Sequence, residues 1–451
     1  MRPSSSPSEG LFSAVLARGP VAAECTDDAW LRALLDVEAA LARAVASVGL
    51  VPEEVARGVT AACADASAYD VHELGRSAAA GGNPVIPLVR AIERRAGDAG
   101  WAVHYGATSQ DVVDTAMVLV AERAVRALLE ELAAVVAAAA GLGQRYRDTV
   151  MIGRTLLQQA VPTTFGLKAV GWAVALHGGR ERLASLALPV QLGGAAGTLA
   201  SYGGRGRDVS LALATELGLR PAVLPWHTAR LPVADLAGAL GATAGVVGKV
   251  ALDVVLLAQS EVGEVGEGGA DRGGSSAMPH KRNPVAAVSA RAAARRAPGL
   301  VATLLACMEQ EHERAAGAWH AEWAPMSDLL VSVGSATAWL RECLTSVVID
   351  PDRMRLNVET AREAFGAETL AAALAPSLGR ARAHDVVSAA ARTAQQEGGR
   401  VRDVLERDPR IREALMTGEV NVPPDKATSV GEASALVDAA LAAIDAARSG
   451  S

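Results

Sequence analysis

Residues 268–285 read GGADRGGSSAMPHKRNPV and interrupt a chain that is otherwise rich in alanine, leucine and valine. Glycines allow a loop to move and allow backbone N–H groups to approach a ligand. The stretch also carries hydroxyl, ammonium and amide groups, on Ser275, Ser276, Lys281 and Asn283. These groups can bind a carboxylate and stabilise an enolate-like oxyanion. The alternative is a solvated Gly/Ser surface loop, but the pattern is long enough to favour a site for chemistry.

A second polar segment, HYGATSQDVVDTA, covers residues 104–116. Thr108 followed by Asp111 is a variant of the capping box and predicts the start of a long helix, whose free N–H groups attract anions. Thr108, Ser109 and Gln110 are therefore candidates for carboxylate binding. Taken alone, the segment is also typical of an ordinary helix cap, and His104 of a structural histidine.

A third segment, GRTLLQQAVPTTFGLK, covers residues 153–168 and places four polar side chains before a helix expected near Pro162. These side chains belong to Arg154, Thr155, Gln158 and Gln159. Without further context, the segment is a loop that enters a helix.

A fourth segment, EQEHERAAGAWHAEW, gathers two histidines and two tryptophans in a chain that is only 3% aromatic. His312 and His320 are eight residues apart and lack carboxylates at ligand spacing, so we expect no metal site here.

Composition limits the classes of protein that this chain can be. Half of its 451 residues are apolar and few are aromatic, which favours closely packed helices and an all-α fold. The net charge of -7 and the absence of a basic run argue against a nucleic-acid partner. The four cysteines match no metal or disulfide spacing, so we expect no metal, no cofactor and a reducing cytoplasm. The longest charge-free run, residues 236–248, is too short for a membrane span.

Hydrophobic periodicity predicts several helices, over residues 27–48, 111–141, 162–185, 232–262 and 284–314. Long helices rich in alanine cannot bury every apolar side within one chain, so we expect a homo-oligomer. Asp350-Pro351 breaks the pattern. We therefore expect three helical domains, over residues 1–105, 106–350 (a long helical bundle with a mobile loop at 263–284) and 351–451.

These segments together resemble the fumarase/aspartase superfamily, whose loop pattern GSSxMPxKxNP is complete in residues 274–284. Within it, the chain resembles the bacterial 3-carboxy-cis,cis-muconate cycloisomerases, on stretches such as LLDVEAALARA, GGNPVIPLVR, QLGGAAGTLA and LGRARAHDVV. The resemblance implies an all-α homotetramer with a long central bundle, active sites built from three subunits, and a small polycarboxylate substrate.

The resemblance also assigns roles to residues. It implies that Ser275 exchanges a proton at the carbon α to a carboxylate and that Lys281 and Asn283 hold carboxylate oxygens, with Ser276 beside them. The opposite wall would consist of Thr108, Ser109, Gln110, Thr155 and Gln158. Further candidates are His104, Arg154, Gln159, His280 and Arg282.

Two departures from the superfamily pattern bear on the reaction. Fumarases carry a histidine directly after Gly-Arg-Thr as a general acid or base, whereas this chain has Leu156. A leucine moves no proton, so the group that leaves or adds must be a weak base, such as a carboxylate oxygen. Relatives of the cycloisomerase usually have histidine where this chain has Gln159, a departure that bears on the substrate and not on the reaction class.

Three functions are consistent with these patterns. The first is lactonisation of 3-carboxy-cis,cis-muconate to 4-carboxymuconolactone. The second is a lyase of the same superfamily that expels a weakly basic group, of the nitrosuccinate or adenylosuccinate type. The third is a structural protein without activity, like the lens crystallins that derive from this superfamily; the intact loop motif argues against it.

Overall fold

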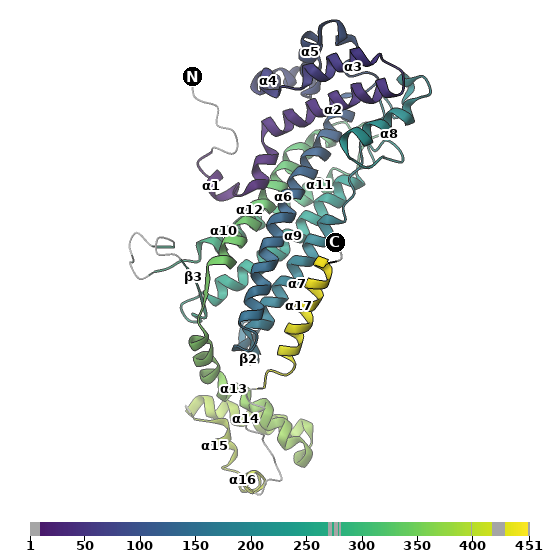
Figure 1. Cartoon of the computed structure of the whole chain (residues 1–451). Helices are drawn as coiled ribbons and strands as arrows, with labels where there is room; N and C mark the ends of the chain where they lie inside the picture. Colours follow the sequence, from purple (N-terminus) through teal and green to yellow (C-terminus); the bar gives the residue numbers. More distant parts are fainter. Residues whose placement is uncertain are drawn as a thin grey trace. The chain divides into compact units, whose positions relative to one another are not determined.

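The computed structural model describes residues 10–268, 273–274, 278, 281–397, 399–416 and 429–449, which Figure 1 draws in colour. The chain divides into two compact units. The first contains the chain up to Val135, Leu176–Leu252 and Ala286–Cys343; the second contains Val136–Ala175, Asp253–Val285 and the chain from Leu344 onward. The three sequence-based domains stay a prediction.

The elements are mainly helices, in agreement with the predicted all-α fold. The helices up to residue 217 are α1 (Ser13–Leu16), α2 (Asp27–Ser47), α3 (Glu53–Cys63), α4 (Val71–Gly81), α5 (Val85–Ala96), α6 (Ser109–Arg145), α7 (Phe165–Ala184) and α8 (Gly206–Leu217). The later ones are α9 (Leu231–Leu257), α10 (Val285–Ala294), α11 (Ala297–Ala306), α12 (Ala318–Ser346), α13 (Pro351–Leu378), α14 (Arg380–Glu397), α15 (Val401–Leu405), α16 (Pro409–Met416) and α17 (Ala433–Ser449). Two antiparallel strand pairs are β1 (Val150–Thr155) with β2 (Gln158–Thr164), and β3 (Val265–Glu267) with β4 (Val347–Ile349).

Helix α2 forms where the sequence predicts it. The Oγ1 of Thr26 accepts a hydrogen bond from the N–H of Ala29 at 3.2 Å, which caps the first turn. Asp27 and Asp28 follow in that turn, where negative charge is favourable near the helix N-terminus. The helix buries a broad apolar face that includes Leu34, Val37 and Leu41, beside Glu38.

The helix predicted over residues 284–314 is wrong, because the structure has two short helices there. Helix α10 ends at Ala294, and α11 begins at Ala297 and ends at Ala306. Pro298 has no N–H group to donate to the carbonyl of Ala294, and its ring would clash with that turn. The proline is tolerated in the first turn of α11, where the N–H groups have no partner within the helix.

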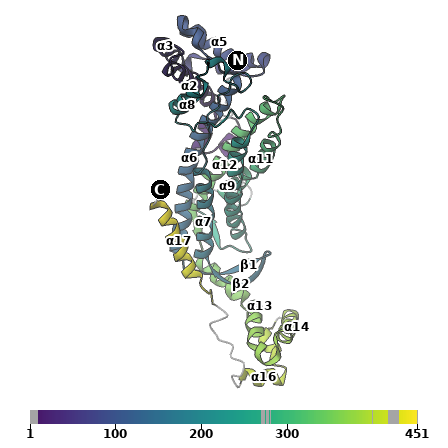
Figure 2. The same cartoon turned by 90° about the vertical axis from the view of Figure 1, so that its right-hand side faces the viewer.

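Within the first unit, segments of α6, α7, α9 and α12 lie side by side in both ribbon views (Figures 1 and 2). Small residues bring α9 close to its neighbours. A Cβ on Gly241 would lie 2.9 Å from the Val301 side chain, and one on Gly248 would lie 3.3 Å from Ala294. The bundle therefore achieves its close packing through glycine and alanine, as the aromatic-poor composition predicts.

Helix α9 is the one described helix that is long and apolar enough to cross a membrane, and 44% of its most apolar window is buried inside the chain. It extends beyond the charge-free run at residues 236–248 that the sequence analysis considered. Core helices of water-soluble proteins pass the same test, so this feature is weak evidence for a membrane span.

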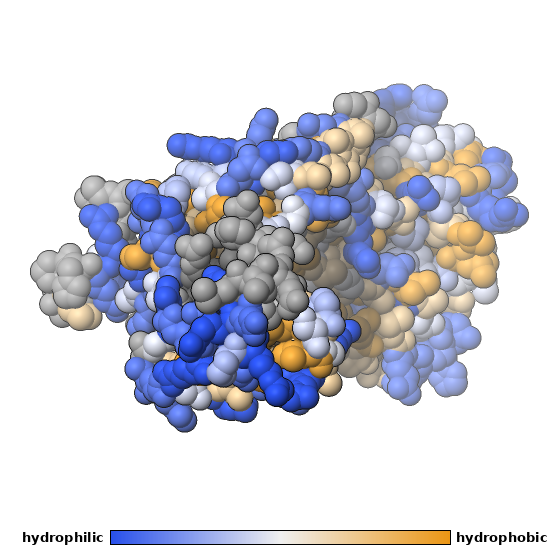
Figure 3. All heavy atoms as spheres, turned by 90° about the horizontal axis from the view of Figure 1, so that it is seen from below, coloured by the Kyte–Doolittle hydropathy of each residue, from blue (hydrophilic) through white to orange (hydrophobic). Residues whose placement is uncertain are grey.

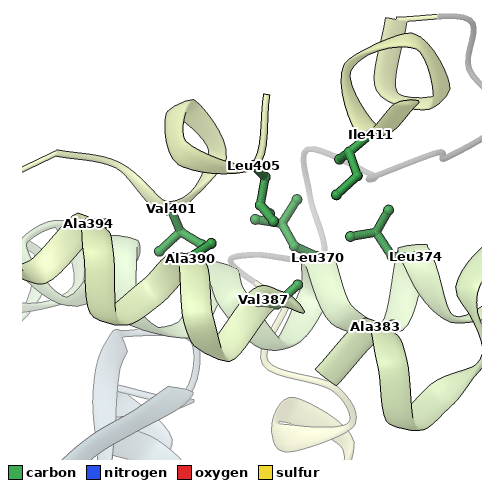
Figure 4. Packing of buried hydrophobic residues seen from close by; sticks show 9 residues of the cluster. All are labelled: Leu370, Leu374, Ala383, Val387, Ala390, Ala394, Val401, Leu405 and Ile411. Carbon is green, nitrogen blue, oxygen red and sulfur yellow. The ribbon is translucent and has the colours of Figure 1, made fainter. Parts of the chain in front are cut away.

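The second unit contains both strand pairs and a separate small core. Figure 2 shows the β1–β2 hairpin beside α13. In Figure 4, side chains from α13 to α16 point toward one another; the cluster contains Leu370, Leu374, Ala383, Val387, Ala390, Ala394, Val401, Leu405 and Ile411. Asp350 caps α13 by accepting from the N–H of Arg353 at 2.9 Å, so a helix begins at Pro351; the domain boundary predicted there stays a prediction.

One face of the molecule is drawn by hydropathy in Figure 3. Hydrophobic residues on this face form small patches between hydrophilic ones. Single exposed apolar residues are normal on proteins, so these patches alone indicate no binding site.

Candidate active site

In the first unit, the segment around Thr108 leads into α6 as predicted. The N–H of Thr108 donates to Asp111 Oδ2 at 3.0 Å, and the N–H of Asp111 donates to the carbonyl of Thr108 at 3.0 Å. The capping pair is thus present, with the carboxylate of Asp111 as the acceptor. Thr108 and Ser109 are half-buried. Their predicted role in binding stays a prediction.

Asp111 also holds a second loop against this helix start. Its carboxylate accepts from the N–H groups of Gly193 and Gly194, each at 2.9 Å, and lies 2.7 Å from His227 Nε2. Asp111 and His227 are both buried. The segment QLGGAAGTLA, which carries part of the family resemblance, is therefore attached directly to the Thr108 loop.

Beneath this loop, Arg230 forms a buried ionic network. Its guanidinium donates to Asp114 at 2.7 and 3.0 Å and to Glu322 at 3.0 and 2.5 Å. Arg230 and Glu322 are each 1% exposed as side chains and Asp114 is 2% exposed. Burial raises the pKa of Glu322, although Arg230 opposes this. The network joins α6, the start of α9 and α12 within the unit.

Gln110 and Trp319 also donate hydrogen bonds to Asp114 in this network. The Gln110 amide donates to Asp114 and to the carbonyl of His227, and its oxygen accepts from Arg314 at 3.2 Å. Gln110 is fully buried. The indole N–H of Trp319 donates to Asp114 Oδ1 at 2.9 Å. These contacts favour a supporting role for Gln110, and its predicted contact with substrate remains untested.

His104 lies four residues before Thr108 and is bound to the buried Glu38 of α2. Its Nδ1 is 2.7 Å from Glu38 Oε1, and its N–H donates to Oε2 at 3.0 Å. The structure therefore places His104, Thr108, Ser109 and Gln110 in one short stretch of the first unit. Glu38 lies in the stretch LLDVEAALARA that carries part of the family resemblance, but the sequence analysis gave it no role, because it belongs to a regular amphipathic helix.

In the second unit, the third segment forms the β1–β2 hairpin. Thr155 pairs with Gln158, and Arg154 pairs with Gln159. The turn consists of Leu156 and Leu157, which have positive φ angles of 50° and 65° and are 96% and 77% exposed. Positive φ is uncommon for leucine, and two-residue hairpin turns of this kind usually use Asn-Gly.

Arg154 is engaged at the base of this hairpin. Its guanidinium donates to the two carboxylate oxygens of Glu264 at 2.9 and 2.7 Å. Glu264 is buried, and Asn357 also donates to it at 2.8 Å. Since Glu264 directly precedes β3 and the glycine-rich loop, this ion pair joins the bases of the two segments. It favours a structural role for Arg154, whose predicted contact with substrate stays untested.

The glycine-rich loop is described only in part. Ser275, Ser276 and His280 lie outside the described residues. Asn283 donates from its N–H and its Nδ2 to the carbonyl of Gly273, at 2.8 and 3.0 Å. Gly273 has φ 70°, and a Cβ there would lie 2.3 Å from the Asn283 carbonyl oxygen, so glycine is required.

The remaining loop candidates are both exposed. Lys281 donates its backbone N–H to the carbonyl of Met278 at 3.0 Å, and Arg282 forms an isolated bridge with Gly274. The loop and the hairpin belong to the second unit and the Thr108 stretch to the first, so the predicted site residues form two groups. Among the described residues, no group of three or more His, Cys, Asp or Glu is arranged to hold a metal ion.

Comparison with known proteins agrees with the loop motif. Residues 16–299 match the family model described as lyase. The chain belongs to this lyase family. This family is part of the fumarase/aspartase superfamily that the sequence motifs indicated, and the family and the all-α fold are thus confirmed.

Three similar lyase-family proteins span nearly the whole chain. The nitrosuccinate lyase of Streptomyces davaonensis is 43% identical over 451 residues, covering 97% of this chain and 95% of the relative. The 3-carboxy-cis,cis-muconate cycloisomerase of Pseudomonas aeruginosa is 43% identical over 444 residues, covering 97% and 96%. The crystal structure of the 3-carboxy-cis,cis-muconate lactonizing enzyme from Pseudomonas putida has a TM-score of 0.86 at 38% identity, covering 96% and 98%.

Proposed function

We propose that this lyase-family protein is a 3-carboxy-cis,cis-muconate cycloisomerase that forms 4-carboxymuconolactone. Relatives and a solved structure with this activity in their names support the proposal. The observation that carries the type of reaction is the exposed Leu156 at the hairpin turn, next to Thr155. A leucine at this position can neither donate nor accept a proton. The group that attacks or leaves must therefore be a weak base, which needs no general acid or base.

The substrate itself supplies such a base. One of its carboxylate oxygens attacks an alkene carbon, so a C–O bond forms and the π electrons move to the neighbouring carbon, which is α to a carboxylate. Ser275 gives its hydroxyl proton to that carbon, which completes the lactone, and the serine alkoxide then takes a proton from water. The attacking carboxylate has a pKa near about 4 in water and is ionised at neutral pH without a general base. Holding it beside the alkene replaces a bimolecular step by an intramolecular one.

The remaining candidates bind the substrate in this proposal. Lys281 and Asn283 hold carboxylate oxygens, and Ser276 lies beside the proton donor. The opposite wall consists of Thr108, Ser109, Thr155 and Gln158, with Gln110, Arg154, Gln159, His280 and Arg282 as neighbours or supports.

All four cysteines are free thiols, which supports the cytoplasmic location expected from the sequence.

A second candidate is nitrosuccinate elimination, because a nitrosuccinate lyase is 43% identical over nearly the whole chain. Nitrite is a weak base and leaves without a general acid, so Leu156 is compatible with this reaction as well. The purified protein should be assayed with carboxymuconate, by loss of diene absorbance, and with nitrosuccinate, by nitrite release. We expect kcat/KM to favour carboxymuconate by at least about 100-fold. A preference for nitrosuccinate would replace the first proposal by the second.

We also propose a homotetramer whose active sites combine segments from different subunits. Helix α9 exposes a row of small residues, Gly238, Ala242 and Gly245, which would allow a helix of another copy to approach closely. The hairpin exposes Leu156 and Leu157 in a strained turn, a feature expected of a segment that contacts another chain.

Subunit complementation is the expected consequence of shared sites. Ser275→Ala and the double variant Thr155→Val/Gln158→Leu should each be nearly inactive as pure tetramers. Co-expression of the two chains should restore about a quarter of wild-type kcat, because random assembly leaves that fraction of sites with both segments intact. Activity of purified mixed tetramers measures this, and two differently tagged Ser275→Ala chains serve as the control. No recovery would mean that both segments come from the same subunit.

A further inference from the structure

Glu38 and His104 form a pair that the proposed mechanism does not use. Glu38 has a fully buried side chain on α2, and His104 is 19% exposed. His104 contacts both carboxylate oxygens of Glu38. Its Nδ1 lies 2.7 Å from Oε1, and its backbone N–H donates to Oε2 at 3.0 Å. The contact therefore orients the ring as well as the backbone of His104. With Nδ1 turned toward Glu38, Nε2 is the ring nitrogen that faces away.

The backbone at His104 is held in an unusual conformation. Its φ is 57°, in the left-handed region that few residues other than glycine adopt. Two residues later, Gly106 has φ 70°, and a Cβ there would lie 2.7 Å from the ring of Tyr202. Tyr202 donates its hydroxyl to the carbonyl of Tyr105 at 3.0 Å. Strain of this kind persists where the surroundings enforce it, and it is frequent at functional sites.

Among the described residues, the charged groups with the largest effect on His104 are three carboxylates. Glu38 on α2, Asp111 on α6 and Glu93 on α5 each favour the protonated ring. Burial opposes them and is the largest single influence, but the pKa of His104 is raised above its ordinary value. Of these three carboxylates, Asp111 is already hydrogen-bonded to the backbone N–H groups of Thr108, Gly193 and Gly194 and lies 2.7 Å from His227 Nε2. Glu38 is in direct contact and is the main source of the stabilisation.

We propose that Glu38 is a positioning residue that holds His104 as a cation, whose Nε2–H donates to a carboxylate oxygen of the substrate beside Thr108 and Ser109. The inference rests on the proposed polycarboxylate substrate and adds a cationic contact from the first unit. His104 binds the acid group, and Glu38 never touches the ligand. Because the ring loses its charge as pH rises through its pKa, binding of a polycarboxylate weakens above that pH.

The first test uses the unmodified protein and a non-reacting probe, propane-1,2,3-tricarboxylate. The imidazole NMR signals of His104, assigned by their loss in His104→Asn, are followed between pH 5 and 9 with and without the probe. Asparagine tolerates the left-handed backbone, so this variant should fold. The expected result is a pKa above that of an ordinary histidine, raised further by the probe. A depressed pKa, or one that the probe does not move, would overturn the proposal.

The second test compares Glu38→Gln with Glu53→Gln, the same change at a side chain that is 83% exposed. The glutamine amide can still accept from the His104 N–H, but the ring becomes neutral because burial remains and the charge is gone. We expect Glu38→Gln to weaken probe binding about tenfold at neutral pH and to regain wild-type affinity at low pH, where the ring is protonated again.

The pH dependence separates positioning from general damage. A merely structural role would weaken probe binding equally at every pH, and equal affinity of both glutamine variants would also contradict the proposal. Failure of the protein to convert carboxymuconate would refute the proposed function alone, since neither the titration nor the probe affinity depends on turnover.

Discussion

The Ser275→Ala protein is expected to lose at least about 10²- to 10³-fold in kcat with carboxymuconate. The serine hydroxyl is the proposed proton donor to the carbon that the attacking carboxylate leaves electron-rich, and alanine offers no proton. Affinity for propane-1,2,3-tricarboxylate should change little, because Lys281 and Asn283 remain. Steady-state kinetics and probe titration measure the two effects separately.

Ser260→Ala is the matched control, since Ser260 is an exposed serine before the loop. It should retain wild-type kcat. A second readout is exchange of the lactone α-proton with deuterated water, which Ser275→Ala should lose along with turnover. Near-normal turnover by Ser275→Ala would remove the serine from the mechanism.

Replacing Arg230 by methionine is expected to lower the free energy of unfolding by about 3–5 kcal/mol. The guanidinium neutralises Asp114 and Glu322 where water is excluded, and all three side chains are at most 2% exposed. Methionine fills a similar volume but leaves two buried carboxylates without a cation. Guanidinium chloride unfolding at a fixed protein concentration measures the loss, because an oligomer's stability depends on concentration.

The control is Arg205→Met, which removes a surface ion pair with Asp208 whose partners are about half exposed. Exposed pairs contribute about 0–1 kcal/mol, so this variant should remain close to wild type. The triple variant Arg230→Met/Asp114→Asn/Glu322→Gln should recover much of the lost stability, since no unpaired charge remains. Equal stability of Arg230→Met and Arg205→Met would contradict the role assigned to the network.

The pH dependence of Arg230→Met has a defined sign. Burial raises the pKa of Glu322 even beside Arg230, and without the guanidinium this pKa should lie further above its unfolded value. The folded state then binds more protons than the unfolded state, and the variant becomes more stable as pH falls toward the raised pKa of Glu322. The destabilisation relative to wild type should therefore be largest at neutral and alkaline pH.

Local sequence predicted the features that depend on neighbouring residues. The cap of α2 by Thr26, the start of α6 beside Thr108 and Asp111, and the boundary at Asp350 each involve residues at most three positions apart. Backbone preference and side-chain capping operate at that range, so a short window contains the information. The break between α10 and α11 was also encoded locally, by Pro298, but the hydrophobic periodicity of the longer segment concealed it.

The motif of the glycine-rich loop indicated the family for a similar reason. Its hydroxyl, amine and amide groups are contiguous, so their types and order can be read directly from residues 274–284. The pattern says which chemistry the loop offers. Sequence patterns do not show what Arg154 and Gln110 contact, because their partners are distant in the chain. Arg154 pairs with Glu264, and Gln110 accepts a hydrogen bond from Arg314.

The sequence by itself thus determined the helical class, the lyase family, the main caps and the chemical character of the loop. Only the tertiary structure decided the pairs that support the site: Arg230 with Asp114 is separated by 116 positions, and His104 with Glu38 by 66. Glu38 and Glu322 lie in segments that the sequence analysis noted, LLDVEAALARA and EQEHERAAGAWHAEW, but neither segment indicates which group each carboxylate would meet. A buried charge is acceptable only where the fold brings a partner to it, and that partner is selected by the packing of helices, not by local propensity.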